Sequence, residues 1–275
     1  MASKTAQDVS SEPRGFELLL AYVGEPLVLA FLELRGIAQT AALTVAYAIR
    51  GQRRREETWS QALRIGNHSL LFVAAVAASL GTTLVYQAGL QAQRILGDLT
   101  LLGPLYLQLL LREFGPTITA LMLATRVGTG ISAEIGSMVV TEQVDALRMS
   151  GVHPVEYLIV PRFWASTVMM LCLVCFSVLV SWVAGMLTAQ LAFGVSPLTF
   201  AKLTFIIPGD VVLMLLKSLV YGMTIPIVAG ASGLAAHGGS EGVGWATTQS
   251  VVNCSLIILF EDFLLSGFGY LFLLR

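Results

Sequence analysis

Long stretches without a charged side chain dominate the hydrophobic pattern of this chain. A helix needs about 20 apolar residues to cross the hydrocarbon layer of a membrane, and four stretches approach or exceed that length. They run between Arg64 and Arg94, between Arg162 and Lys202, from Ser218 to Ser240, and from Gly242 to Phe260. Because a backbone inside lipid must have all its hydrogen bonds satisfied within the protein, each stretch is predicted to be a transmembrane helix.

A fifth apolar segment extends from about Leu99 to Val140 and is interrupted by charged residues. It is long enough to cross the membrane in spite of them. The pattern therefore predicts an all-α integral membrane protein whose five transmembrane helices form one domain, residues 64–275.

The N-terminal region has a different pattern. Gly36 to Ile49 is apolar but too short to span, so we interpret Pro26 to Arg50 as a helix lying along the membrane surface. Together with the basic turn that follows, it accounts for residues 26–55. Residues 1–25 are expected to be a polar segment, because their first part lacks the apolar core of a signal peptide.

The arginine cluster before the first crossing predicts the orientation. Cytoplasmic segments carry an excess of Lys and Arg, so Arg50, Arg53, Arg54 and Arg55 place the N-terminus in the cytoplasm. Because each crossing carries the chain to the other side of the membrane, the 141–162 connection and the turn at 237–244 are predicted to be cytoplasmic. The 193–209 loop and the C-terminus are predicted to lie outside.

Composition agrees with a membrane protein. Of the 275 residues, 56% are hydrophobic and 12% are charged, whereas a soluble domain carries about a quarter of its residues as Asp, Glu, Lys and Arg. A net charge of −1 argues against a nucleic-acid surface. The three cysteines lie in apolar stretches without a Cys/His cluster, so neither a metal site nor a disulfide framework is predicted.

Motifs for soluble catalysis are missing from the sequence. It contains no G-x-x-x-x-G-K-[ST] phosphate loop, no G-x-S-x-G and no H-E-x-x-H. We therefore expect no catalytic residue, no cofactor of its own and no ATP hydrolysis by this chain. Energy for transport would have to come from a partner or from a gradient.

Charged side chains at membrane depth are the candidates for function. Each costs about 2.5–3.5 kcal/mol to insert, so a chain keeps them where they face protein, water or cargo. They could also pair only to fix helix positions, and the pattern leaves both roles open. The candidates are Arg112, Glu113, Arg126, Glu134, Lys217, Glu261 and Asp262.

Small residues form a surface on the second crossing that would let another helix approach closely. They include Gly128, Gly130 and Gly136. Packing within the bundle and contact between subunits are equally compatible with this surface.

The segment Thr141 to Pro154 predicts a short helix with its own boundaries. Thr141 can cap its start, acidic residues favour its N-terminal end, and Arg148 suits its C-terminal end. Gly151 and then Pro154 stop it. Composition alone favours a plain connector.

The second crossing and the residues after it carry a family resemblance. The stretch Leu111-Arg-Glu-Phe-Gly-Pro-Thr-Ile-Thr-Ala-Leu-Met-Leu-Ala-Thr-Arg-Val-Gly-Thr-Gly-Ile-Ser-Ala-Glu-Ile-Gly136, with Thr141-Glu-Gln-Val-Asp-Ala-Leu and Pro161-Arg-Phe-Trp-Ala165, resembles the MlaE/YrbE family of ABC transporter permeases. The likeness covers the chain from about Gly66 to its C-terminus.

The resemblance implies a homodimeric permease in the inner membrane that moves phospholipids or related lipids between membranes. ATP would be bound by a separate cytoplasmic ATPase subunit, and a periplasmic protein with an MCE domain would be a further partner. Whether a small STAS-type accessory protein is present stays open.

The resemblance also assigns roles to residues. It implies that the helix at about 141–152 is the coupling helix that docks into the ATPase, through Glu142, Gln143, Asp145, Leu147 and Arg148. It further implies that polar side chains line or support the lipid cavity, and the candidates are Glu134, Lys217, Asp262 and Arg126.

Two other classes of function compete with this interpretation. A secondary transporter would use Glu134 or Asp262 to bind protons or cations. However, the chain has no evident repeat between its halves, which argues against that fold. An intramembrane lipid-modifying enzyme would need a nucleophile or an acid/base cluster, and the sequence offers no convincing one. No short sequence motif identifies the class of lipid or the direction of transport.

Overall fold

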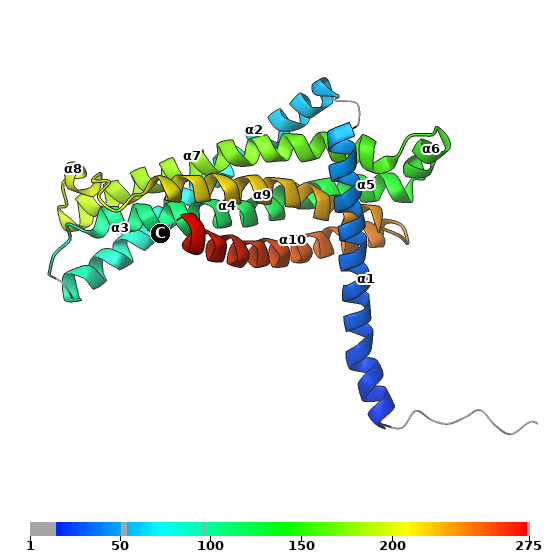
Figure 1. Cartoon of the computed structure of the whole chain (residues 1–275), viewed down its shortest axis with the longest axis horizontal. Coiled ribbons are helices and arrows are strands. Elements are labelled where there is room, and N and C mark those ends of the chain that lie inside the picture. The colour runs from blue at the N-terminus through cyan, green and yellow to red at the C-terminus, as the bar shows by residue number, and fades with distance from the viewer. Residues whose placement is uncertain (1–14, 51–53, 96, 274–275) are drawn as a thin grey trace, which may run out of the picture. The chain divides into compact units, whose positions relative to one another are not determined.

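A computed structural model describes residues 15–50, 54–95 and 97–273, and within these ranges the regular structure is all helix, with no strand. Four helical stretches are long and apolar enough to cross a membrane, judged by length and composition. They are α2 (Arg55–Ile95), α7 (Val160–Phe193) with the π-helical turn Val155–Ile159 before it, α9 (Pro208–Leu234), and α10 (Ser240–Phe268) with the π-helical turn Gly269–Leu273 after it. The expectation of an all-α membrane protein is confirmed (Figure 1).

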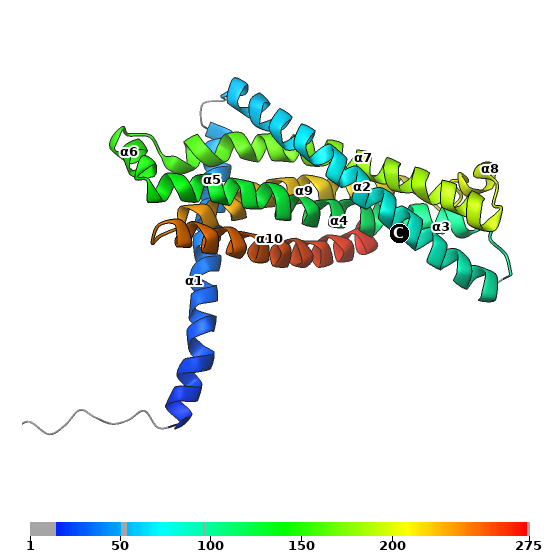
Figure 2. The same cartoon turned by 180° about the vertical axis from the view of Figure 1, so that it is seen from behind.

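The interrupted fifth segment is helical along its whole length but is built from short pieces. They follow one another without a break as α3 (Leu102–Leu109), a π-helical turn (Leu110–Phe114), α4 (Gly115–Leu123), a second π-helical turn (Ala124–Gly128) and α5 (Thr129–Val140). No single piece is long enough to span. The number of crossings therefore stays a prediction, although the run as a whole follows the bundle in both views (Figures 1 and 2).

Several predicted helix ends were wrong because charge-free length was the criterion. α9 begins at Pro208 rather than Ser218, and α10 continues past Phe260 to Phe268. In both cases the helix includes charged residues, whose partners inside the bundle make them tolerable. The helix in the stretch between Arg162 and Lys202 ends early, at Phe193, because Gly194 takes the left-handed conformation with φ 68° that commonly terminates a helix.

The long helices pack around close contacts at small residues. α7 packs most extensively against α2 and also against α9, while α10 packs against α5 and α9. A Cβ atom at Gly81 of α2 would clash with the backbone carbonyl of Ser181 on α7. A Cβ atom at Gly222 of α9 would lie 2.8 Å from the Cα of Thr167, again on α7. The spacing between these helices is thus set by the absence of a side chain.

The short helices mark the two ends of the bundle. α6 (Gln143–Met149) lies at one end and α8 (Pro197–Phe200) at the other (Figures 1 and 2). α2 begins at the α6 end, so the predicted cytoplasmic connection and the basic start of the first crossing share one side of the protein. The 193–209 loop, which contains α8, lies at the opposite end of the bundle, as expected for segments separated by one crossing of the membrane.

α6 has the predicted position but different boundaries. Thr141 does not cap it, because its hydroxyl donates to the Ser137 carbonyl at 2.7 Å. Glu142 occupies the N-cap position with φ 59°, a left-handed conformation that is unusual for a residue other than glycine. Gly151, with φ 76°, ends the segment, and Pro154 begins the next helical turn instead of stopping α6.

The N-terminal helix α1 (Gly15–Arg50) begins before the predicted start at Pro26. Residues 1–39 form one compact unit and residues 40–275 another. In the second unit, Ala48 packs with Val160, Phe163 and Ile227, which fixes the end of α1 on the bundle. The position of this helix along the membrane surface stays a prediction. Residues 1–14 and the basic turn at 51–53 lie outside the described residues.

Candidate functional site

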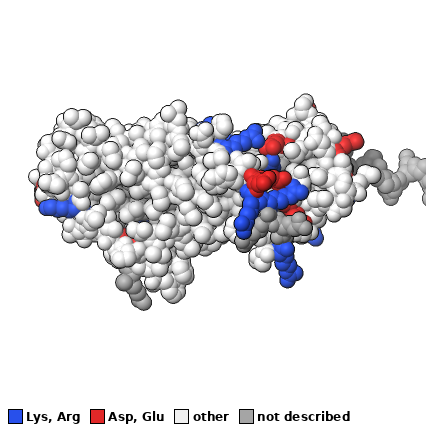
Figure 3. Space-filling view, turned by 90° about the horizontal axis from the view of Figure 1, so that it is seen from above, with Lys and Arg blue, Asp and Glu red and all other residues white. Residues whose placement is uncertain are grey.

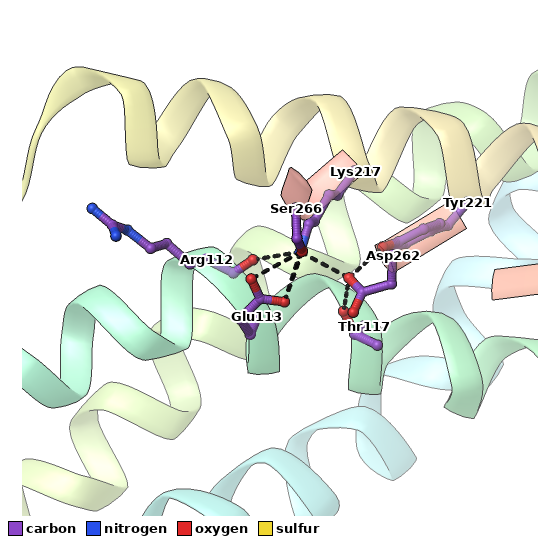
Figure 4. Close-up of polar contacts among 7 residues, drawn as sticks. All are labelled: Arg112, Glu113, Thr117, Lys217, Tyr221, Asp262 and Ser266. Carbon is purple, nitrogen blue, oxygen red and sulfur yellow. Dashed lines mark hydrogen bonds and ion pairs between the residues drawn. The ribbon is translucent and has the colours of Figure 1, made fainter. Parts of the chain in front are cut away.

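A lysine buried between three helical segments is the centre of the most extensive polar cluster. The side chain of Lys217, on α9, has no exposed surface. Its Nζ donates to the Arg112 carbonyl at 2.8 Å, to Glu113 Oε2 at 2.8 Å, to Asp262 Oδ1 at 2.7 Å and to Ser266 Oγ at 2.7 Å (Figure 4). We call Glu113, Lys217, Asp262 and Ser266 the lysine cluster. It connects the π-helical turn 110–114 with α9 and α10.

The local sequence explains why a backbone carbonyl is free to bind the lysine. In an α-helix the Arg112 carbonyl would accept from the N–H of residue 116, but Pro116 has no N–H. The backbone also bulges here, because the Gly115 N–H reaches back to the Leu110 carbonyl as in a π-helix. Lys217 therefore donates to a carbonyl whose α-helical donor is missing.

Asp262 joins the cluster to two hydroxyl groups. The same carboxylate oxygen, Oδ1, accepts from Lys217, from the Tyr221 hydroxyl at 2.7 Å and from the Thr117 hydroxyl at 2.8 Å (Figure 4). Two carboxylates thus share one ammonium group, which leaves the cluster with a formal charge of −1. Since a buried charge is tolerated only when it is paired and hydrogen-bonded, this arrangement fixes the three segments relative to one another.

A second ion pair lies beside the lysine cluster. Arg112 directs its guanidinium group away from Lys217 (Figure 4), and its Nε donates to Asp210 Oδ1 at 2.6 Å. Asp210 has no exposed surface, and its other oxygen accepts from the Ile207 N–H at 3.0 Å. This carboxylate both binds the N-cap N–H of α9 and ties the first turn of α9 to the π-helical turn 110–114. We did not single out Asp210 from the sequence, although an Asp two residues after Pro208 is a typical signal of a helix start.

Adjacent carboxylates on α10 have different partners. Glu261, next to Asp262, accepts from the Thr224 hydroxyl at 2.7 Å. Its second oxygen is buried and has no hydrogen-bond partner among the described residues. Of the two, Asp262 is therefore the residue that belongs to the lysine cluster.

Glu134 and Arg126 lie at a separate site between α2 and the 124–140 helical segments. They line a cavity of about 310 Å³ together with Gln61, Arg64, Ile65, His68, Ser69, Val127, Gly130 and Ile131. We call it the polar cavity. Glu134 Oε2 lies 3.0 Å from Arg162 on α7 and 3.9 Å from Arg64. Arg126 lies over the Phe72 ring at 5.9 Å from its centroid.

The four predicted cavity residues therefore fall into two groups. Lys217 and Asp262 are in direct contact, whereas Glu134 and Arg126 share the polar cavity. Glu113 of the lysine cluster and Glu134 belong to one helical run, and the residues between them correspond to a rise of about 30 Å at 1.5 Å per residue. The two groups thus occupy different depths of the bundle.

The three glycines also differ in their surroundings. A Cβ at Gly128 would make ordinary contacts with Cys254, Ile225 and Ser250, and one at Gly136 would approach Ala236 at 3.3 Å. Both glycines serve packing within this chain. Gly130 has open space instead, and it lines a groove of about 520 Å³ with residues of α5 and α10: Thr129, Ala133, Thr247, Thr248, Val251 and Val252. Contact between subunits stays a prediction for Gly130.

The predicted coupling residues lie on a helix that is anchored on one face. Val144 is buried in a cluster with Ile131 and Ile135 of α5 and Ala229 of α9, and Leu147 packs against that cluster. The other four, Glu142, Gln143, Asp145 and Arg148, are exposed, and Arg148 forms an ion pair with Asp145 at 3.0 Å. α6 thus presents polar side chains at the end of the bundle, while its Val144 and Leu147 pack in an apolar cluster with residues of α5 and α9.

The buried ion pairs and the cavities of the bundle indicate the general class of this protein. Apolar helices that enclose buried ion pairs, with polar cavities between them, are typical of a membrane-embedded transport component. The chain belongs to the MlaE permease family, since the family described as "Permease MlaE" matches residues 58–268. It is therefore a multi-pass membrane permease, as the resemblance implied.

Three relatives illustrate the breadth of the family. A "Probable ABC transporter permease protein" of Rickettsia felis is 37% identical over 208 residues, which are 75% of this chain and 80% of the relative. The "Intermembrane phospholipid transport system permease protein MlaE" of Haemophilus influenzae is 34% identical over 209 residues, 74% of this chain and 78% of the relative. The chloroplastic protein "TRIGALACTOSYLDIACYLGLYCEROL 1" of Arabidopsis thaliana is 36% identical over 161 residues, 58% of this chain and 46% of the relative.

Proposed function

We propose that this chain is the permease subunit of an ABC transporter that moves phospholipids or related lipids between membranes. The observation that carries the proposal is the family match over residues 58–268. The Haemophilus influenzae relative is named for intermembrane phospholipid transport, and the Rickettsia felis relative is named an ABC transporter permease. This chain has no phosphate loop, so a separate ATPase subunit supplies the energy.

The polar cavity is the part of the chain that best suits a phospholipid head group. Arg64 and Arg126 line it, and guanidinium groups bind phosphate through paired hydrogen bonds. Glu134 is held by Arg162, which lowers its repulsion toward an anionic head group. The groove beside Gly130 is lined by small and apolar side chains and continues from the polar cavity, because Gly130 lines both. In a homodimer this groove would accept acyl chains between the two copies.

α6 is the element that would transmit the movement of the ATPase. Its exposed polar face is available for docking, and its buried Val144 contacts α5 and α9 through one apolar cluster. A displacement of α6 would therefore move the helix that carries Glu134 and the helix that carries Lys217. In this proposal α6 lies in the cytoplasm, the protein resides in the inner membrane, and an MCE-domain protein contacts the opposite, periplasmic side.

The ion pairs of the bundle argue against a gradient-driven transporter. Asp262 is bound by Lys217 and Glu134 is bound by Arg162, so neither carboxylate is free to take a proton or a cation as its main partner. Protonation of Glu134 would deprive the buried Arg162 of the carboxylate that it pairs with, which is costly.

Purification from the native membrane tests the proposal directly. The tagged protein is extracted in mild detergent, co-purifying proteins are identified, and bound lipids are measured by mass spectrometry. We expect an ATPase with a phosphate loop, an MCE-domain protein and stoichiometric phospholipid. Reconstitution then gives ATP-dependent lipid transfer, which should be absent with a non-hydrolysable nucleotide. Transfer that responds to a proton or cation gradient and ignores ATP would contradict the proposal.

A further inference from the structure

A second cavity, on another face of α2, is apolar inside and basic at its edge. It has a volume of about 380 Å³, and its lining comes from the end of α1, the first turns of α2 and the first half of α7: Tyr47, Ala48, Arg54, Arg55, Thr58, Trp59, Ala62, Val160, Pro161, Trp164, Ala165, Val168 and Met169. We call it the lateral cavity. Ala62 lines it, whereas the neighbouring Gln61 lines the polar cavity, so the two are separate sites.

The lateral cavity opens toward the apolar exterior of the protein. Val168 is 53% exposed and Trp59 is 67% exposed, and both line it. In a protein that crosses a membrane, such exposed apolar surface faces lipid chains. Tryptophan and tyrosine at this level are typical of the boundary between the hydrocarbon and the head groups.

The charged part of the lining is entirely positive. Arg54 and Arg55 line the cavity, and no Asp or Glu does. Arg54 is held in place, since its guanidinium carbon lies 4.1 Å from the centroid of the Tyr157 ring and its Nη1 lies 2.9 Å from Glu57 Oε1. The contact with Tyr157 raises the pKa of Arg54 above its usual value, so this group stays cationic. On the face seen in Figure 3, charged side chains gather over the end of the bundle where α2 begins, and the rest of that face is almost uncharged.

We propose that the lateral cavity binds one anionic phospholipid from the surrounding leaflet. Its phosphate lies at Arg54 and Arg55, its glycerol region lies against Trp59 and Trp164, and an acyl chain occupies the space beside Ala165 and Val168. Arginine pairs with phosphate through charge-assisted hydrogen bonds, and basic residues next to a membrane helix attract anionic lipids. The inference depends on the membrane location of the chain and not on the identity of the transported lipid.

Photocrosslinking in nanodiscs tests the site. The full-length protein is reconstituted with phosphatidylglycerol or phosphatidylcholine that carries a diazirine in one acyl chain, and labelled residues are mapped by mass spectrometry. We expect phosphatidylglycerol to label the Trp164 to Met169 segment of α7, and phosphatidylcholine to label it less. Replacing both Arg54 and Arg55 with Gln should reduce labelling by phosphatidylglycerol about tenfold, since hydrogen bonds to charged groups contribute about 1.4 kcal/mol or more.

Two further variants separate the cavity from general lipid contact. Val168→Trp should fill the cavity and abolish labelling of the segment by both lipids, because Val168 lies at its exposed edge. Leu179→Trp, on the same helix, is the matched control, since Leu179 is 59% exposed and does not line the cavity. Arg94→Gln, at the far end of α2, controls for the loss of a positive charge.

The labelling results distinguish a phospholipid in the lateral cavity from a partner helix. Unchanged labelling in Val168→Trp, or equal labelling by the two lipids that the double arginine variant does not alter, would overturn the proposal. Exclusive crosslinking of the cavity to a co-purifying protein would also overturn it, because the occupant would then be a partner helix.

Discussion

At the scale of single residues, one proline determines much of the lysine cluster. Pro116 removes the N–H that would bind the Arg112 carbonyl, and Lys217 replaces it with a charged donor. The lysine can remain charged in the bundle because Glu113 and Asp262 lie within 2.8 Å of it. Each of these side chains is costly alone, and the cluster is stable only as a whole.

Removal of the lysine should therefore be strongly destabilising. Lys217→Met leaves two carboxylates close together without a cation, and breaking a buried pair in this way costs about 3–5 kcal/mol. We expect a clear decrease in the apparent melting temperature in detergent, measured by scanning fluorimetry. Lys202→Met, at an exposed lysine, is the control. A variant that also carries Glu113→Gln and Asp262→Asn should recover part of the loss, and equal melting of all four proteins would refute the role of the cluster.

At the scale of elements, the helices are held together by contacts that require glycine. Gly81 lies against the backbone of Ser181, so α2 and α7 touch without an intervening side chain. α6 is held differently, since its Val144 and Leu147 pack in one apolar cluster with residues of α5 and α9 while its polar side chains stay exposed. Close backbone packing therefore sets the position of α2 against α7, whereas the division of α6 into a buried apolar and an exposed polar face sets the position of α6.

Substitution of the contact glycine should separate α2 from α7. Gly81→Ala introduces a methyl group that meets the Ser181 carbonyl oxygen, and overpacking of this kind costs about 1–3 kcal/mol. The melting temperature in detergent should decrease. Gly244→Ala makes no such contact and should be neutral or stabilising, because Ala is the better helix former. A decrease of the same size in both variants would show that the close approach is unimportant.

The residue before α6 allows the side chain and the backbone to be tested separately. Glu142 has φ 59°, so Glu142→Gly keeps a favourable backbone while it removes the carboxylate. If the carboxylate contacts the ATPase, this variant should fold normally but bind the ATPase more weakly in a pull-down assay or lose lipid-stimulated ATP hydrolysis. Ser150→Ala, next to the other end of α6, serves as the exposed control. Normal assembly and coupling in Glu142→Gly would exclude that contact.

At the scale of the whole molecule, the two ends of the bundle differ. The α6 end carries the basic start of α2, and the α8 end carries the 193–209 loop. Since basic segments stay in the cytoplasm, this difference predicts the direction in which the protein inserts.

Cysteine labelling tests that orientation. Met149 is 89% exposed at the α6 end and Leu198 is 85% exposed at the α8 end, so single cysteines at these positions should not disturb the fold. In a background without Cys172, Cys175 and Cys254, a membrane-impermeant maleimide added to spheroplasts should label Leu198→Cys at once. It should label Met149→Cys only after permeabilisation. The reverse pattern would invert the topology, and labelling of both from one side would disprove it.

The sequence alone was enough to show that the chain is a helical membrane protein and where most of its helices lie. This was possible because lipid enforces helical hydrogen bonding on any long apolar segment, so composition and length suffice. The position of α6 also followed from local signals. Of the charged residues identified at membrane depth, ion pairs within the bundle hold Arg112, Glu113, Glu134, Lys217 and Asp262.

Which charged residues pair with one another became clear only from the folded arrangement of the helices. Lys217 could not be paired with Glu113 and Asp262 from the sequence, since its partners are far away along the chain and a side chain gives no signal of its distant neighbours. The helix ends at Pro208 and Phe268 were missed for the same reason, because Lys217 and Glu261, which seemed to terminate the runs, have partners on other helices. The separation of Glu134 from Lys217 likewise depends on the packing of the bundle, as does the lateral cavity, whose walls come from three different helices.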